Sequence, residues 1–164
     1  ALDILDNIIP YIPGEEEKVE RESQKILGVQ EGGSVTHASF PVSATCTRAA
    51  VLEGHTEAVS VATEKPCTPE EVAEIFREFG TELTSMGLPS APQRLITVHD
   101  DPFRPQPRLD RDADGGMTTS VGRIRSDHAW EHGIKYMLVS HNTLMGAAKG
   151  AVLVAEYMAA TEQL

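Results

Sequence analysis

The sequence predicts an α+β domain, and two kinds of segment support this prediction. Helices are expected where a capping residue stands at one end of an apolar stripe: Gly28 follows Glu15–Leu27, and Thr68 precedes a second helix. Strands are expected where short runs are rich in valine, threonine and isoleucine and tend to alternate with polar residues. The predicted strands are Ser34–Thr47 with a break at Pro41, Thr56–Thr63, Arg94–His99, Met117–Ile124 and Ile134–Val139.

Length and charge exclude several classes of function. The chain has 164 residues, of which 40% are hydrophobic, so it can form one domain with its own core. Its 25 acidic and 14 basic residues give a formal net charge of -11, which argues against nucleic acid and anionic membranes as partners. No apolar run approaches the ~18 residues of a membrane span. Two cysteines, Cys46 and Cys67, provide no disulfide framework, so a reduced, cytoplasmic setting is expected.

The N-terminal part contains an extended segment and a helix. Residues 3–12 are expected to be extended and apolar, with a turn at Pro13–Gly14. The helix that follows places three glutamates in its first turn, where the helix dipole favours negative charge. Glu15, Lys18 and Glu22 share one helical face, and from the residues alone a solvated ion pair is the simplest interpretation. The stripe expected to be buried is Val19, Ser23, Ile26 and Leu27.

The middle of the chain carries a clear helix start and a long loop. Thr68-Pro69-Glu70-Glu71 combines an N-cap threonine, a proline at the first helical position and a glutamate three residues after the cap. Residues 100–116 form the longest irregular segment, and a calcium loop is rejected because Val121 stands where the closing glutamate is needed. No metal site is predicted, although the last loop holds four possible ligands: Asp127, His128, Glu131 and His132.

The C-terminal segment Asn142–Met158 is predicted to be a helix. It is rich in glycine and alanine at first and then apolar around much of its circumference, which is typical of a buried helix.

The stretch from Ala44 to Val61 contains the residues best suited to chemistry. Arg48 offers a planar fork of donors for a carboxylate or phosphate, and His55 has the side chain whose unperturbed pKa lies nearest neutrality. In one straight strand these two residues, seven positions apart, would face opposite sides, so Leu52–Gly54 must turn the chain if both reach one ligand. The simpler alternatives are a solvated strand arginine and a structural histidine.

The pattern Cys-Thr-Arg, six residues, then His-Thr-Glu-Ala-Val resembles the aspartate-semialdehyde dehydrogenase family in its archaeal and fungal form. The resemblance runs from Leu2 to the final helix and covers the C-terminal half of that family. It implies a mixed, largely antiparallel sheet with helices on one side, as in the C-terminal domain of glyceraldehyde-3-phosphate dehydrogenase-like proteins. Residues 1–164 would then form a substrate-binding and dimerisation domain, with the helix of residues 141–164 packing on an NADP-binding domain that the chain lacks.

The resemblance also implies roles for individual residues. His55 matches the family's acid/base, and Arg48 matches the clamp on the substrate carboxylate. Glu15 and Lys18 match a glutamate and a lysine that contribute to substrate and phosphate binding, and Asn142 matches an asparagine close to the nicotinamide. No metal is implied.

The reaction implied is the interconversion of aspartate 4-semialdehyde, phosphate and NADP with aspartyl phosphate and NADPH, in the pathway to lysine, threonine and methionine. A cysteine forms a thiohemiacetal, hydride leaves and phosphate attacks the thioester. In the family that cysteine lies upstream of the segment matching Leu2–Asn7, so Cys46 is not taken as the nucleophile. The glycine-rich loop of a dinucleotide site is missing as well.

The chain alone is therefore expected to be an inactive fragment that self-associates, within a parent that forms a dimer or tetramer. Two alternatives stay open. One is an acyl-phosphate reductase for another substrate, such as N-acetylglutamyl phosphate. The other is a non-catalytic interaction domain.

Overall fold

The computed structural model describes residues 2–163, which fall into two compact units, residues 1–50 and 51–164. The unit of residues 1–50 contains the 3-10 turn η1 (Leu2–Ile4), helix α1 (Glu15–Ile26) and a small antiparallel hairpin of β1 (Val29–Glu31) and β2 (Ser34–Thr36). The helix begins after the Pro13–Gly14 turn and ends just before Gly28, as predicted. The segment of residues 3–12, expected to be extended, instead begins with η1 and has a single β-bridge at Ile9.

The predicted strand Ser34–Thr47 is wrong beyond Thr36, because helix α1 takes up the backbone groups that a strand would pair. The side chain of Gln24 donates to the carbonyl of Phe40 at 2.9 Å. Carboxylates one and two turns earlier on α1 accept backbone N–H groups, Glu20 from Ala44 at 3.1 Å and Glu16 from Cys46 at 2.8 Å. Residues four apart share one helical face, so this row holds the irregular segment along the helix.

The stripe predicted to be buried on α1 is also wrong. Ile26 and Leu27 are 78% and 67% exposed, and α1 has no buried residue. The side chains of Glu16, Glu20 and Gln24 instead provide hydrogen bonds to the backbone of residues 40–46 in this unit.

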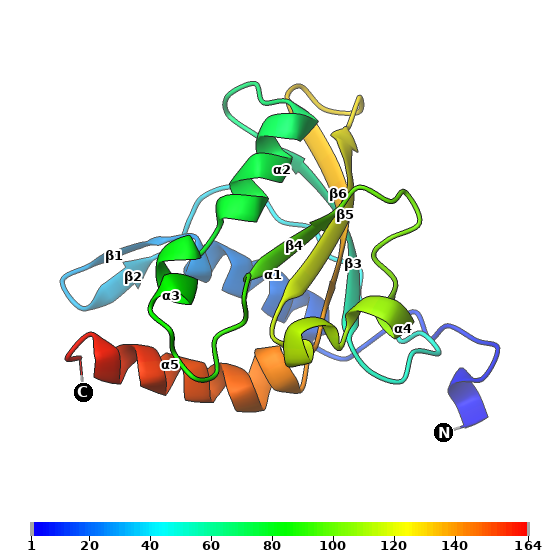
Figure 1. Cartoon of the computed structure of the whole chain (residues 1–164). Coiled ribbons are helices and arrows are strands. Elements are labelled where there is room, and N and C mark those ends of the chain that lie inside the picture. The colour runs from blue at the N-terminus through cyan, green and yellow to red at the C-terminus, as the bar shows by residue number, and fades with distance from the viewer. Residues whose placement is uncertain (1, 164) are drawn as a thin grey trace. The chain divides into compact units, whose positions relative to one another are not determined.

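The unit of residues 51–164 is built on a four-stranded sheet in the order β3-β6-β5-β4 (Figure 1). Its strands are β3 (His55–Ala62), β4 (Ile96–His99), β5 (Thr119–Ser126) and β6 (Gly133–Ser140). Strand β6 pairs antiparallel with both β3 and β5, while β4 pairs parallel with β5. The expected mixed, largely antiparallel sheet is confirmed. Its buried apolar core consists of Met117, Val121, Ile134 and Val139, together with Leu153.

Helix α2 (Pro69–Glu78) packs along the sheet against β4 and β5, as Figure 1 shows. Its predicted capping box is confirmed: Thr68 accepts the N–H of Glu71, and the Glu71 carboxylate accepts the N–H of Thr68. Phe76 of α2 meets Tyr136 of β6 edge-on, with ring centroids 5.2 Å apart. A short helix α3 (Thr81–Ser85) follows, with Gly80 at its N-cap in the left-handed conformation at a φ of +74°.

The long loop before β5 has local structure that the sequence did not predict. It contains one turn of helix, α4 (Pro107–Asp110), and a 3-10 segment, η2 (Ala113–Gly116). Gly122 of β5 lets this loop come close to the sheet, since a Cβ there would lie 2.4 Å from the carbonyl oxygen of Arg104.

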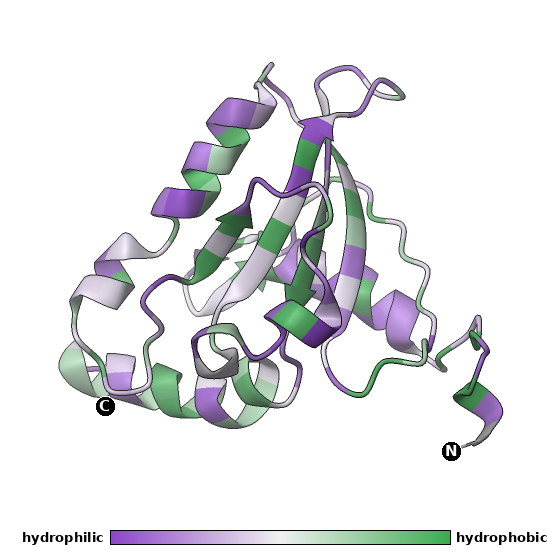
Figure 2. Ribbon diagram, turned by 45° about the vertical axis from the view of Figure 1, so that its right-hand side comes forward, coloured by the Kyte–Doolittle hydropathy of each residue, from purple (hydrophilic) through white to green (hydrophobic). Residues whose placement is uncertain are grey.

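The C-terminal helix begins two residues later than predicted, with a π-helical turn, η3 (Leu144–Ala148), that continues into α5 (Lys149–Ala160). Of its residues only Leu153 is buried, whereas Val152 and Val154 are 49% and 58% exposed. Hydrophobic residues recur along the whole helix (Figure 2). In the chain on its own this helix leaves apolar side chains exposed, and its expected packing on an NADP-binding domain remains a prediction.

Candidate functional site

His55 is the first residue of β3, and register places it opposite Ser140, the last residue of β6. Its side chain is exposed and, within residues 2–163, makes no hydrogen bond or ion pair. Paired residues of neighbouring strands share a face of the sheet, so His55 projects to the side that carries Tyr136. An accessible imidazole at a strand end suits proton transfer.

The backbone just before His55 is fixed by a distant side chain. Gly54 has a φ of +99°, a conformation that glycine adopts readily. Its N–H donates to Oδ1 of Asn142 at 3.0 Å, across 88 residues of sequence. The structure thus brings together two residues that the sequence nominated for separate tasks, His55 and Asn142.

Asn142 follows a buried histidine that shapes the turn after β6. His141 is 6% exposed, and its Nδ1 accepts the N–H of Leu144 at 3.3 Å. In the neutral ring the proton must then reside on Nε2, which lies 3.7 Å from Oδ1 of Asp112. Gly116 packs closely on the ring, since a Cβ there would lie 3.0 Å from Cδ2 of His141. The turn that carries Asn142 is therefore fixed by contacts of the His141 ring with Leu144 on one side and with Asp112 and Gly116 on the other.

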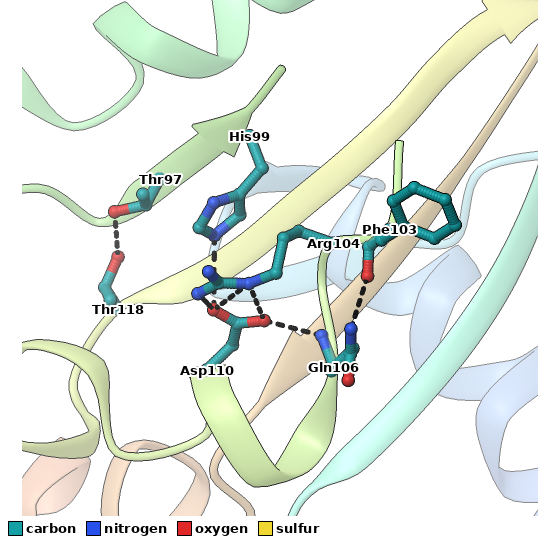
Figure 3. Close-up of polar contacts among 7 residues, drawn as sticks. All are labelled: Thr97, His99, Phe103, Arg104, Gln106, Asp110 and Thr118. Carbon is teal, nitrogen blue, oxygen red and sulfur yellow. Dashed lines mark hydrogen bonds and ion pairs between the residues drawn. The ribbon is translucent and has the colours of Figure 1, made fainter. Parts of the chain in front are cut away.

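A buried ion pair anchors the loop that reaches this turn (Figure 3). The Asp110 carboxylate is 1% exposed and accepts two hydrogen bonds from Nε of Arg104, at 2.9 and 3.1 Å, and others from Nη2 of Arg104 and the N–H of Gln106. Burial alone would raise the pKa of Asp110, but the hydrogen bonds from Arg104 and Gln106 outweigh it and lower that pKa. The ring of His99 on β4 lies 3.5 Å from the same carboxylate.

The two residues after Asp110 lie beside Gly54 and His141. Arg111 follows Asp110 directly, and its Cβ lies 3.4 Å from where a Cβ on Gly54 would be. Asp112 follows it and faces His141. The sequence did not predict this anchor, because the acidic run of residues 110–115, which includes Asp110, was considered only as a calcium loop and rejected. The available signal was an arginine six residues before an aspartate, separated by a stretch with two prolines.

The other nominated residues lie in the unit of residues 1–50. Glu15 is the first residue of α1, and its Oε1 lies 3.7 Å from Nζ of Lys18 one turn later. The two side chains are 35% and 50% exposed. Opposite charges three residues apart on a helix stabilise one another weakly, and both groups stay accessible to a ligand.

Arg48 is held by its backbone alone. It forms an antiparallel bridge with Ile9, through hydrogen bonds of 2.8 and 3.0 Å. Its guanidinium is exposed and has no hydrogen bond or ion pair within the described chain. The bond from the N–H of Cys46 to Glu16 brings the strand-like segment before Arg48 against the first turn of α1, the turn of Glu15 and Lys18. Arg48, Glu15 and Lys18 thus belong to the same unit, and within the described residues no contact joins Arg48 to the other two.

The structure contains no grouping of three or more histidine, cysteine or acidic side chains able to hold a metal, as far as residues 2–163 are described. Asp127, one of the four possible ligands in the last loop, is engaged instead by Ser60 at 2.8 Å and Lys135 at 3.3 Å. The hydrogen bonds from Ser60 and from the N–H of Ala129 lower the pKa of Asp127. None of the helices described has both the length and the apolar character needed to cross a membrane.

Comparison with known families assigns the chain. Residues 1–145 match the model of the semialdehyde dehydrogenase dimerisation domain. The chain belongs to this family. Among curated relatives, the aspartate-semialdehyde dehydrogenase of Methanothermobacter thermautotrophicus is 46% identical over 156 residues, and that of Archaeoglobus fulgidus is 47% identical over 158 residues. These matches cover 95% and 96% of the chain but only 45% and 44% of the relatives, so the chain spans about half the length of the proteins it matches.

Solved structures agree with this assignment. An aspartate semialdehyde dehydrogenase from Candida albicans, determined with NADP, superposes with a TM-score of 0.89 at 42% identity, over 99% of this chain and 47% of that one. Aspartate semialdehyde dehydrogenase II from Vibrio cholerae, complexed with ASA, superposes with a TM-score of 0.73 at 31% identity, over 94% of this chain and 41% of that one. The fold predicted from the sequence is thus that of a family whose characterised members are oxidoreductases.

Proposed function

We propose that this chain is the substrate-binding and dimerisation part of an NADP-dependent aspartate-semialdehyde dehydrogenase, with residues 141–164 forming the helix that packs on the NADP-binding part. Identity of 45% or more to several enzymes of that name, over nearly the whole chain, is the observation that carries the proposal. The reaction interconverts aspartate 4-semialdehyde plus phosphate with 4-aspartyl phosphate. It serves lysine, threonine and methionine biosynthesis in the cytoplasm, a reducing compartment that fits a chain with two cysteines and no disulfide framework.

His55 is proposed as the acid/base. Its imidazole is exposed and engages no other side chain within residues 2–163, so it is free to accept the proton of a thiol nucleophile and later return it. That thiol would come from the part of the enzyme that the chain does not contain. Cys46 is not proposed for the role, because the family's cysteine lies upstream of the segment that matches Leu2–Asn7.

Arg48 is proposed to hold the substrate carboxylate. Its unpaired guanidinium offers two parallel N–H donors, which match the two oxygens of a carboxylate. Glu15 and Lys18 would flank the amino and phosphate groups, since the pair supplies one charge of each sign at the accessible start of α1.

The residues present fit NADP at one point. The Gly54 N–H is a donor, so the Asn142 oxygen must face it and the amide nitrogen must point away, and this nitrogen makes no hydrogen bond in the described chain. Asn142 would hold the nicotinamide end, while the phosphates would be bound outside this chain. When bound, NADP supplies the hydride acceptor.

The test is NADPH formation from aspartate semialdehyde and phosphate by the full-length enzyme, compared with its His55→Asn variant. Loss of proton transfer should lower the rate by ~10²–10⁴-fold and remove the pH dependence that His55 confers. An unchanged rate and pH profile would rule out His55 as the acid/base. The absence of turnover in the full-length wild-type protein, with turnover of another semialdehyde, would rule out the substrate.

We further propose that the chain forms homo-oligomers and that, on its own, it self-associates without catalysing the reaction. Val152, Val154 and Tyr157 of α5 are exposed and leave apolar surface in contact with water, which favours association. Light scattering of the purified chain should give a mass above 17.8 kDa. A monomer at high concentration, or turnover by the chain alone, would contradict this proposal.

A further inference from the structure

The contact between Asn142 and Gly54 takes the place of a missing rung of the sheet. The β3–β6 ladder ends with the pair His55 and Ser140, and the next rung would join Gly54 to His141. The carbonyl of His141 is already occupied, because it accepts the N–H of Gly146 at 3.1 Å in the turn that starts η3. The side-chain oxygen of Asn142 accepts the Gly54 N–H instead, at 3.0 Å. A side chain thereby extends the sheet by one residue beyond the end of β6.

Asn142 can do this because its own backbone is rigidly placed. The buried ring of His141 accepts the N–H of Leu144 and faces Asp112, and Gly116 packs against the same ring. The side chain of Asn142 therefore starts from a fixed point, and only its two torsions remain to be set.

His55 depends on this backbone contact more than a buried residue would. Its imidazole has no partner in residues 2–163 that could orient it, so the direction of its side chain follows from the backbone of Gly54 and His55. Gly54 at φ +99° is the most adaptable residue next to it. The hydrogen bond to Asn142 fixes one end of that adaptable peptide.

We propose that Asn142 is a positioning residue for His55: its Oδ1 fixes the Gly54 peptide and hence the acid/base, while its amide nitrogen remains free for the ligand. This proposal rests on the proposed function. One side chain would then join the nicotinamide end of the site to the proton-transfer group. The two halves of the amide have different tasks, so they can be separated by substitution.

Two variants separate them. Asn142→Asp keeps an acceptor for Gly54 but loses the donor, whereas Asn142→Ala loses both. Asn7→Ala is the matched control, because Asn7 also accepts a backbone N–H, that of Ile8 at 2.9 Å, in the unit of residues 1–50.

The first readout is hydrogen exchange of the Gly54 amide in the 164-residue chain, followed by NMR together with the ring shifts of His55. In Asn142→Ala the exchange should accelerate by about tenfold or more and the His55 ring shifts should move, while Asn142→Asp and Asn7→Ala stay within about threefold of wild type. Unchanged exchange in Asn142→Ala would overturn the proposal.

The second readout is steady-state kinetics of the full-length enzyme. Asn142→Ala should lower kcat by about tenfold or more, whereas Asn142→Asp should mainly raise the KM for NADP. An equal rise in the KM for NADP in both variants, with kcat and Gly54 exchange unchanged, would show that Asn142 only contacts the cofactor. A wild-type enzyme inactive on aspartate semialdehyde would refute the proposed function alone, because Gly54 exchange reports the contact without turnover.

Discussion

Replacing Asp110 with asparagine should cost much of the stability of the unit of residues 51–164. The carboxylate is 1% exposed and accepts from three donors, Nε and Nη2 of Arg104 and the N–H of Gln106. An asparagine has one acceptor oxygen, and its NH₂ group would face guanidinium donors. Hydrogen bonds to charged groups contribute about 1.5–3 kcal/mol each, and breaking a buried pair costs about 3–5 kcal/mol. The Arg104 side chain is 29% exposed and can recover water, so a loss of about 2–4 kcal/mol is expected.

The loss should depend on pH in a defined direction. The pKa of Asp110 is lowered in the folded state, so the carboxylate stabilises the fold above about pH 4, its unfolded pKa. That stabilisation disappears as the pH falls through the lowered folded-state pKa. The difference in unfolding free energy between wild type and Asp110→Asn should therefore be largest near pH 7 and smaller at pH 3.

The assay is urea denaturation followed by far-UV circular dichroism at both pH values. Asp100→Asn is the matched control in the same loop, because Asp100 meets Arg77 at 3.2 Å with its side chain 92% exposed. This control should change the unfolding free energy by less than about 1 kcal/mol. A cost for Asp110→Asn no larger than the control, or one that grows as the pH falls, would refute the reasoning.

Three further substitutions test separate parts of the structure. Arg48→Lys in the full-length enzyme keeps the charge but loses the fork, so kcat/KM for aspartate semialdehyde should fall by about tenfold or more, and normal kinetics would exclude the clamp. Gly54→Ala forces a Cβ onto a backbone at φ +99° and should cost about 1–2 kcal/mol in urea denaturation while moving the NMR signals of His55; a variant as stable as wild type would contradict the strain. Thr68→Ala removes the cap that pairs with Glu71 and should cost about 1 kcal/mol, which Thr68→Ser should restore; equal melting temperatures for all three proteins would count against the cap.

Features set by neighbouring residues could be predicted from the sequence. The start of α2 follows from threonine, proline and glutamate within four positions, because a capping box is complete within one turn. Strand β3 follows from the alternation after Gly54, and the register confirms that Val59 and Val61 share a face. The matches of Arg48, His55, Glu15, Lys18 and Asn142 to a family pattern nominated a site, and their roles remain predictions.

Features set by contacts between distant segments depended on the tertiary structure. Residues 37–47 have strand-like composition, yet Glu16, Glu20 and Gln24 bind their backbone because helix α1 lies beside them. Composition indicates that a segment can form a strand, whereas the element that lies beside it in the folded chain decides which groups its backbone pairs with.

The same reason explains why the support of His55 was invisible in the sequence. Asn142 lies 88 residues from Gly54, and no local pattern indicates that its oxygen replaces a rung of the sheet. The sequence alone predicted a strand directly after His55 and a turn over Leu52–Gly54 before it. Only the folded chain decided which side chain holds that glycine, because the end of β6 and the turn shaped by His141 bring Asn142 to it.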